Sequence, residues 1–267
     1  MTVTFVSCWY ICKAKFDVET YDKWISNFLN NVVNCNIVIY TDNDGYNMLL
    51  KYKKENIKLI KKDLTQFYTY QYKNDWIKNH KKNYLLNHII DWKVNMIWNE
   101  KIYFVHETMT KKYYDTEFYG WCDIGYFRGK SNDIQNETIK KWPCNQTILS
   151  LKKDKVYYAL VNRNTSYIQQ LQHLINNKNS NGLPHNPIPP NQESIAGGFF
   201  ISHKDNITNW CLCFYKRLKL YFQHNYLVKD DQIIIADCVF SDSSLFHLCE
   251  ENDPNYNNWF MFQRILL

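Results

Sequence analysis

The chain has 267 residues, of which 45% are hydrophobic and 17% aromatic, and its net charge is +6. This apolar content is sufficient for a full core, which excludes a mainly disordered chain and the collagen-like and coiled-coil classes. No stretch of eighteen apolar residues occurs, so we predict no membrane span. The lysines are scattered and no run exceeds two basic residues, so we expect no nucleic-acid partner.

Cysteine and the N-terminal sequence indicate a reducing compartment. Nine cysteines are present without a C-x-x-C pair, which favours buried free thiols over a structural zinc site. No basic residue precedes the first apolar run, so the N-terminus is not typical of a signal peptide. We therefore expect a cytoplasmic protein. The abundance of Asn, Tyr, Lys and Ile is typical of AT-rich coding in some bacteria and large DNA viruses. If the protein is viral, the expected location is the cytoplasm of the host cell.

The first sixty residues predict a strand, a helix and a second strand. Residues 3–6 form a short β-rich run, and residues 18–33 carry apolar side chains at helical spacing. Residues 36–40 form a second apolar run, which an acidic turn over 41–45 closes. This order is a βαβ unit and predicts a parallel sheet, with residues 57–60 as a candidate third strand.

The rest of the chain continues the alternation of helices and strands, and no linker divides it. We therefore predict one domain, residues 1–267, with an α/β fold whose central, mostly parallel sheet is flanked by helices. The remaining predicted elements, in chain order, are a helical segment over 83–107, strands over 118–122, 147–151 and 156–161, a proline-rich loop over 176–191, a strand over 194–202, helices over 207–223 and through 232–236, and a strand over 245–248.

The first candidate site is Asp123, a carboxylate that follows an apolar strand and is framed by Gly120 and Gly125. Ligands of parallel α/β sheets bind at the carboxyl ends of strands. A carboxylate there can hold a divalent cation that bridges a diphosphate. The alternative is an aspartate that starts a turn, with glycine supplying a positive φ.

Two further candidates lie in the second half. Gly197 and Gly198 fall inside the predicted strand after the proline-rich loop, where glycine marks either a bulge or the close approach of a ligand. A mobile loop beside such a strand can act as a substrate lid. Asp230 or Asp231 can cap the apolar helix that follows, or Asp231 and Gln232 can meet sugar hydroxyls or an anomeric centre.

Taken together, these segments resemble a known family. The order is W-x-D-x-G-x-x-R over 121–128, A-G-G-F-F over 196–200, and D-Q at 231–232 before an apolar helix. It resembles the WlaTC/HtrL-type (HtrL/YibB-like) glycosyltransferase-like family, as does the segment W-N-E-K over 98–101. The resemblance implies a GT-A fold, with a Rossmann-like nucleotide-binding half over about 1–130 and an acceptor-binding half over about 131–267.

The resemblance also implies roles for individual residues. Asp123 would take the position of the first carboxylate of a D-x-D motif, and the glycine pair would line the donor sugar. Asp231 and Gln232 match the D-Q of glycogenin-like retaining transferases, in which the glutamine lies near the anomeric carbon. The residues implied to bind the nucleotide sugar are Ser7, Tyr10, Thr41, Asp42, Lys101, Asp123, Gly125, Arg128, Gly197 and Gly198.

The second carboxylate of the D-x-D motif is replaced by Gly125. A divalent cation, Mn²⁺ or Mg²⁺, would then need another ligand beside Asp123, for which His247 is the candidate. The alternative is that His247 is a packed core residue. Lys101 or Arg128 can also neutralise a diphosphate without any metal.

The sequence therefore favours a glycosyltransferase that moves a sugar from a nucleotide-diphosphate sugar, such as a UDP-sugar, to a hydroxyl of a glycan or glycoprotein. Catalysis needs positive charge against the leaving diphosphate and a donor and acceptor held in line. Inverting chemistry requires a general base, with Asp231 and Glu193 as candidates. Retaining chemistry would use Asp231 or Gln232 on the other face of the sugar. The alternative is a non-catalytic GT-A-like protein that binds glycan or nucleotide, which the missing second carboxylate favours.

Overall fold

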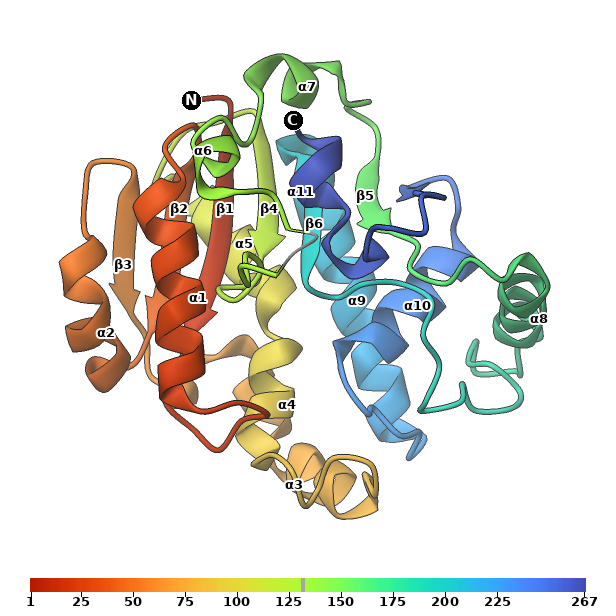
Figure 1. Ribbon diagram of the computed structural model, residues 1–267. Helices are drawn as coiled ribbons and strands as arrows, with labels where there is room; N and C mark the ends of the chain where they lie inside the picture. The colour runs from red at the N-terminus through yellow and green to blue at the C-terminus, as the bar shows by residue number, and fades with distance from the viewer. Residues whose placement is uncertain (131–132) are drawn as a thin grey trace.

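The computed structural model describes residues 1–130 and 133–267 as an α/β fold around one sheet (Figure 1). The seven strands of this sheet lie in the order β3-β2-β1-β4-β6-β5-β7. The strands are β1 (Val3–Trp9), β2 (Asn36–Thr41), β3 (Ile57–Lys61), β4 (Phe118–Cys122), β5 (Val156–Ala159), β6 (Phe199–His203) and β7 (Phe246–Cys249).

The helices differ widely in length. They are α1 (Val18–Asn31), α2 (Asn43–Leu49), α3 (Lys73–Lys82), α4 (Trp92–Trp98), α5 (Lys101–Thr110), α6 (Asn136–Ile139), α7 (Asn145–Ser150), α8 (Thr165–Asn176), α9 (Lys204–Gln223), α10 (Asp231–Ser241) and α11 (Phe262–Ile265). Short 3₁₀ turns cover Leu50–Tyr52, Leu64–Gln66, Tyr68–Tyr72 and Asn258–Phe260.

The sheet is mostly parallel, and β6 is the strand that runs the other way. β1 pairs in parallel with β2 and β4, β2 with β3, and β5 with β7. β6 pairs antiparallel with both β4 and β5. The amino end of β6 therefore lies at the edge of the sheet where β1 and β4 have their carboxyl ends, which is the lower edge in Figure 1.

Helices cover both faces of the sheet, because its strands carry apolar side chains on both faces. Val3 and Phe5 of β1 pack on the face covered by α1, whereas Val6 packs on the opposite face. There α5 contacts β1 and β4, and α9 contacts β4 and β6 (Figure 1). Two apolar layers thus hold the carboxyl ends of β1 and β4 in fixed positions.

The predicted α/β fold with a mostly parallel central sheet is confirmed, and each of the seven observed strands matches a predicted one, with bounds that differ by at most five residues. The strand predicted over 147–151 is wrong, since this segment is the short helix α7. The helical segment predicted over 83–107 is divided into α4 and α5, after a stretch of turns.

Two local predictions near the site also need correction. The turn over 41–45 is the start of α2, whose N-cap Asp42 accepts a hydrogen bond from the Gly45 amide at 2.8 Å. Gly197 and Gly198 precede β6 instead of lying inside it, because the ladder with β4 begins at the pair Cys122 and Phe199.

Two features that the composition predicts, free thiols and the lack of a membrane span, can be compared with the structure. All nine cysteines are free thiols. No helix in the described residues combines the length and the apolar character that crossing a membrane requires.

Helix α9 offers a matched test of the core. Leu218 is fully buried, whereas Leu212 on the same helix is 66% exposed. We predict that Leu218→Ala lowers the free energy of unfolding by about 2–5 kcal/mol, because a cavity remains in the core. Leu212→Ala should change it by less than about 0.5 kcal/mol. Urea unfolding measures both, and equal effects would contradict this packing.

Candidate active site

A cleft opens where β1 and β4 end. After β1 the sheet continues to β2 on one side and to β4 on the other, so this is the point at which strand order reverses. Open α/β sheets bind ligands at such a crevice, outside the carboxyl ends of the strands. Residues 8–12, at the end of β1 and just after it, line the same cavity as Trp121 of β4 and residues 123–125, which follow β4. A second cavity, of about 410 Å³, continues from it and shares Lys101, Asp123 and Arg128.

Lys101 is the charged centre of the cleft. Its ammonium lies 3.2 Å from Oδ1 of Asp123 and 3.0 Å from Oδ2 of Asp231. It also donates a hydrogen bond to the carbonyl of Gly197 at 2.9 Å. The side chain of Lys101 is only 8% exposed, so three oxygens replace water around this buried charge.

Lys101 begins α5, and buried polar contacts fix this helix start. The preceding Glu100 accepts hydrogen bonds from the amides of Tyr68 and Thr69 and from the Thr69 hydroxyl. The hydroxyl of Tyr215 on α9 donates to the carbonyl of Asn99 at 2.9 Å. The backbone that carries Lys101, at the start of α5, therefore cannot shift without breaking buried hydrogen bonds.

Asparagines position Asp231 at the start of α10. Asn79 exchanges two hydrogen bonds with the backbone of Val228, whose carbonyl also accepts from Asn95. Asn83 donates to the carbonyl of Lys229. These contacts hold the segment that enters α10 against α3 and α4, so the Asp231 carboxylate stands beside Lys101.

The glycine pair closes the cluster from the side of β6. The amide of Asp123 donates to the carbonyl of Gly198 at 2.9 Å. A Cβ on Gly197 would lie 2.8 Å from Oδ2 of Asp231, and one on Gly198 would lie 3.2 Å from Oδ2 of Asp123. A side chain at Gly197 would therefore force the Asp231 carboxylate to move, whereas one at Gly198 would require Asp123 to shift by only a few tenths of an ångström.

The charges of the cluster are strongly coupled. Burial raises the pKa of Asp231 to about 6, although Lys101 opposes this shift. Burial would lower the pKa of Lys101, but Asp123 and Asp231 together raise it above its ordinary value. Lys101 therefore stays charged at neutral pH, whereas Asp231 gains or loses its proton near pH 6. The indole of Trp121 adds a hydrogen bond to Oδ1 of Asp123 at 2.6 Å.

Arg128 carries a second positive charge at the cleft. Its guanidinium lies 4.5 Å from the ring centre of Trp24 and 5.1 Å from that of Phe260. Its Nε donates to the carbonyl of Gly125 at 3.0 Å. In the described part of the chain it forms no ion pair with a carboxylate, so the two terminal amino groups keep donor capacity.

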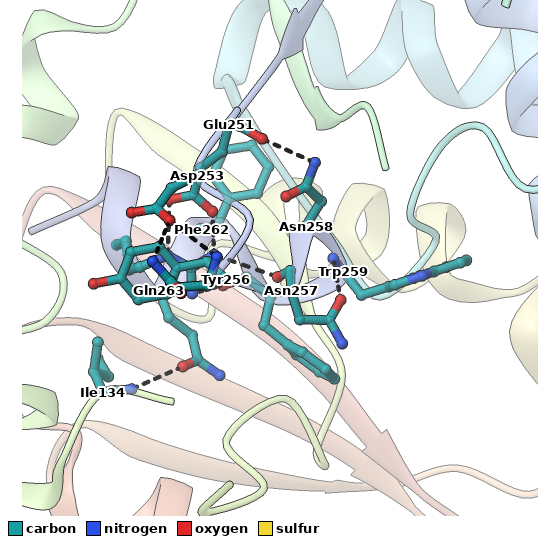
Figure 2. Close-up of polar contacts among 12 residues, drawn as sticks. Ile134, Glu251, Asp253, Tyr256, Asn257, Asn258, Trp259, Phe262 and Gln263 are labelled. Atoms are coloured by element: carbon teal, nitrogen blue, oxygen red, sulfur yellow. Dashed lines mark hydrogen bonds and ion pairs between the residues drawn. The ribbon is translucent and has the colours of Figure 1, made fainter. Parts of the chain in front are cut away.

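The segment that precedes α11 forms another wall (Figure 2). Asn257 accepts from the amide of Trp259 at 3.0 Å, and Asn258 donates to the carbonyl of Glu251. Gln263 joins this wall to the body, because it donates to the carbonyl of Tyr126 and accepts from the amide of Ile134. Asn257 and Trp259 line the cleft as well as an adjoining hollow that contains Glu193.

Ten of the predicted site residues line the combined cleft. They are Tyr10, Lys101, Asp123, Gly125, Arg128, Glu193, Gly197, Gly198, Asp231 and Gln232. Tyr10 lies at the apolar end, where its hydroxyl donates to the carbonyl of Lys62.

Three predicted nucleotide contacts are not brought to the cleft. Ser7 is fully buried within β1. Thr41 is also buried and donates to the carbonyl of Trp9 at 2.5 Å. Asp42 caps α2 and accepts from the amide of Ile11 at 3.3 Å. Thr41 and Asp42 therefore hold the segment after β1 instead of lining the cavity.

The predicted pairing of Asp123 with His247 around one metal ion needs correction. His247 is on β7, and β6 and β5 separate this strand from β4. It is exposed, and its ring packs 4.9 Å from that of Tyr157. The two side chains therefore do not share a site.

The remaining donor set does not fit a divalent cation. A Cβ on Gly125 would lie 2.7 Å from Trp24, so a second carboxylate has no room there. The ammonium of Lys101 already lies between Asp123 and Asp231. Among the described residues, no group of three His, Cys, Asp or Glu side chains is arranged to hold a metal ion.

The sequence did not single out several lining residues, among them Lys15, Lys130, Asn257, Trp259 and Phe260. Nothing in the sequence distinguishes Lys15 from the other lysines. In the structure its ammonium lies 4.9 Å from the ring centre of Trp98. Asn257, Trp259 and Phe260 belong to no motif, and they line the cleft only because the fold packs the C-terminal segment against it.

Fold and site together define an α/β protein with a polar cleft at the reversal point of its sheet. The family described as "Bacterial protein of unknown function (HtrL_YibB)" matches residues 7–266, so the chain belongs to this family. This confirms the resemblance that the three motifs carry. No curated protein matches the chain.

The chain is also similar to a solved structure. The 4-diphosphocytidyl-2C-methyl-D-erythritolsynthase from Anaerococcus prevotii DSM 20548 is 11% identical, and the match covers 98% of this chain and 94% of that chain with a TM-score of 0.42. The fold is assigned from the order and direction of the strands in the sheet.

The pKa of Asp231 leads to a prediction for stability. Asp231 faces Lys101, Asp123 and Asp230, and its folded-state pKa of about 6 lies above its ordinary 3.8. Protonation therefore favours the folded state, and this contribution is complete below pH 4 and lost as the pH rises through 6. A shift of this size corresponds to about 3 kcal/mol.

We therefore expect wild type to lose about 3 kcal/mol between about pH 3 and pH 7 relative to Asp231→Asn, which has no such titration. Urea unfolding at several pH values gives the difference. Parallel stability profiles for the two proteins would contradict the raised pKa.

Proposed function

We propose that this protein is a glycosyltransferase of GT-A type, which transfers a sugar from a nucleoside-diphosphate sugar to a hydroxyl of a glycan. The two halves of the single domain, about 1–130 and 131–267, would bind donor and acceptor respectively. The observation that carries the proposal is the cluster of Lys101, Asp123 and Asp231 against the Gly197–Gly198 backbone, at the reversal point of the sheet.

The two parts of the cleft suit the two parts of such a donor. The end nearest β1 is lined by aromatic and aliphatic side chains, including Tyr21, Trp98 and Trp121, which can pack against a nucleobase or ribose. The other part holds carboxylates and glycine backbone, which suit hydroxyl groups of a sugar. The neighbouring hollow with Glu193 and Trp259 leaves space for an acceptor.

Asp231 is the group best suited to act as a general base. A base works best when its pKa lies near the operating pH, and burial raises the pKa of Asp231 to about 6. In an inverting transfer, the acceptor oxygen forms a bond to the anomeric carbon as its proton passes to Asp231. The bond to the β-phosphate oxygen breaks, and the electron pair leaves with the nucleoside diphosphate. Glu193, at the mouth, is the other candidate base, and Gln232 would serve a retaining transfer.

Thermal shift against UDP-, GDP- and CMP-sugars, with Mn²⁺ and with EDTA, tests this function. We expect one nucleotide class to raise the melting temperature, because ligand binds only the folded state. Donor hydrolysis and transfer should then follow with that class. Asp123→Ala should abolish the shift or the turnover. A shift without turnover on any acceptor would favour a non-catalytic binding protein, and no shift with any nucleotide would exclude donor binding.

The glycine pair allows a graded test of the geometry. Gly197→Ala places a methyl group 2.8 Å from Oδ2 of Asp231, whereas Gly198→Ala gives the milder contact of 3.2 Å to Asp123. A displacement of about 1 Å can cost about a hundredfold in rate. We therefore predict a fall in kcat of about a hundredfold for Gly197→Ala and a smaller fall for Gly198→Ala. Steady-state kinetics on folded variants decide this, and the reverse order would contradict the role of Asp231.

A further inference from the structure

We propose that the ammonium of Lys101 takes the place of a divalent cation in this cleft, so that a nucleoside diphosphate is bound without metal and Arg128 supplies the charge that faces it. This inference rests on the proposed donor class. It concerns which positive charges the site uses, and it can fail while the glycosyltransferase function stands.

The surroundings of Lys101 are those of a small oxygen-bound cation. Oδ1 of Asp123, Oδ2 of Asp231 and the carbonyl oxygen of Gly197 all lie 2.9–3.2 Å from its Nζ. Carboxylate and carbonyl oxygens are the ligands that hard divalent cations take. A metal ion could use Asp123 and Asp231 together only if the ammonium left, and the lysine stem is anchored in the buried start of α5.

Lys101 itself has little capacity left for phosphate. An ammonium has three N–H donors, and three oxygens already lie within contact distance of its Nζ. With two carboxylates beside it, the cluster also carries no net positive charge while both are ionised. The charge for a diphosphate must therefore come from elsewhere on the cleft.

Arg128 is prepared for this task. Trp24 and Phe260 hold the guanidinium, and its Nε is fixed on the carbonyl of Gly125. It lines both parts of the cleft together with Lys101 and Asp123. A planar guanidinium with free terminal amino groups matches phosphate geometry, whereas a lysine at the same place would lose the aromatic contacts.

The first experiment measures metal binding directly. Mn²⁺ is titrated into the full chain and followed by electron paramagnetic resonance. We expect no stoichiometric site in wild type, and one Mn²⁺ in Lys101→Ala, where the oxygens around the missing ammonium become free. Lys101→Ala with Asp231→Asn should lose that site again. One tight Mn²⁺ in wild type that Asp123→Asn removes would overturn the proposal.

The metal readout does not depend on activity, and thermal unfolding of each variant shows whether it is folded. If Lys101→Ala does not fold, Lys101→Met replaces it, because the longer apolar side chain fills the stem's space without an ammonium. A folded variant that gains no Mn²⁺ site would also overturn the proposal.

The second experiment measures binding of UDP, GDP and CDP by calorimetry in EDTA and in Mn²⁺. We expect equal affinities with and without metal for the nucleotide that binds. Arg128→Gln should weaken binding by about tenfold or more, since charge-assisted hydrogen bonds are lost, and Arg128→Lys should recover only part. Lys153→Gln, which removes the same charge from an exposed position at the amino end of β5, should have no effect.

The outcomes separate the two proposals. Binding that requires Mn²⁺, or that is unchanged in Arg128→Gln, refutes the metal-free arrangement and leaves the donor class intact. Absence of binding by every nucleotide in both conditions refutes the proposed function itself.

Discussion

The buried ammonium of Lys101 is the interaction on which the candidate site depends. Its oxygen partners come from the end of β4, the stretch before β6 and the start of α10, which are far apart in the chain. An unpaired charge in such a place would cost several kcal/mol, so each segment is held to the others. Fold and site therefore share one network, and the carboxylates cannot move independently of the sheet.

The direction of one strand makes this network possible. Because β6 runs antiparallel to β4, its amino end and the glycine pair before it reach the edge where Asp123 lies. A parallel β6 would place the glycine pair at the opposite edge. The helices α5 and α10 also begin at this edge. Hydrogen bonds of Glu100 and Tyr215 fix the start of α5, and hydrogen bonds of buried asparagines fix the start of α10. The reversed strand thus supplies a backbone surface in a site that is otherwise made of side chains.

Sequence patterns found those parts of the site that are local in the chain. Asp123 after its strand, the adjacent glycines and the Asp-Gln pair that begins α10 are short motifs, and all of them line the cleft. The same reasoning failed for Thr41 and Asp42, because a capping aspartate after a strand has the same local pattern as a ligand contact. It also failed for His247, since nothing in the sequence states that two strands lie between β7 and β4.

The sequence by itself determined the α/β class, the parallel βαβ start, the family and many of the residues that line the candidate site. These follow from periodicity, strand spacing and short motifs, which depend on near neighbours. Only the tertiary structure decided that Lys101 stands between two carboxylates, that Trp24 leaves no room for a second carboxylate at Gly125, and that the segment ending in Phe260 closes the cleft. Such arrangements arise from packing between distant segments, and burial then gives the charges their altered pKa values.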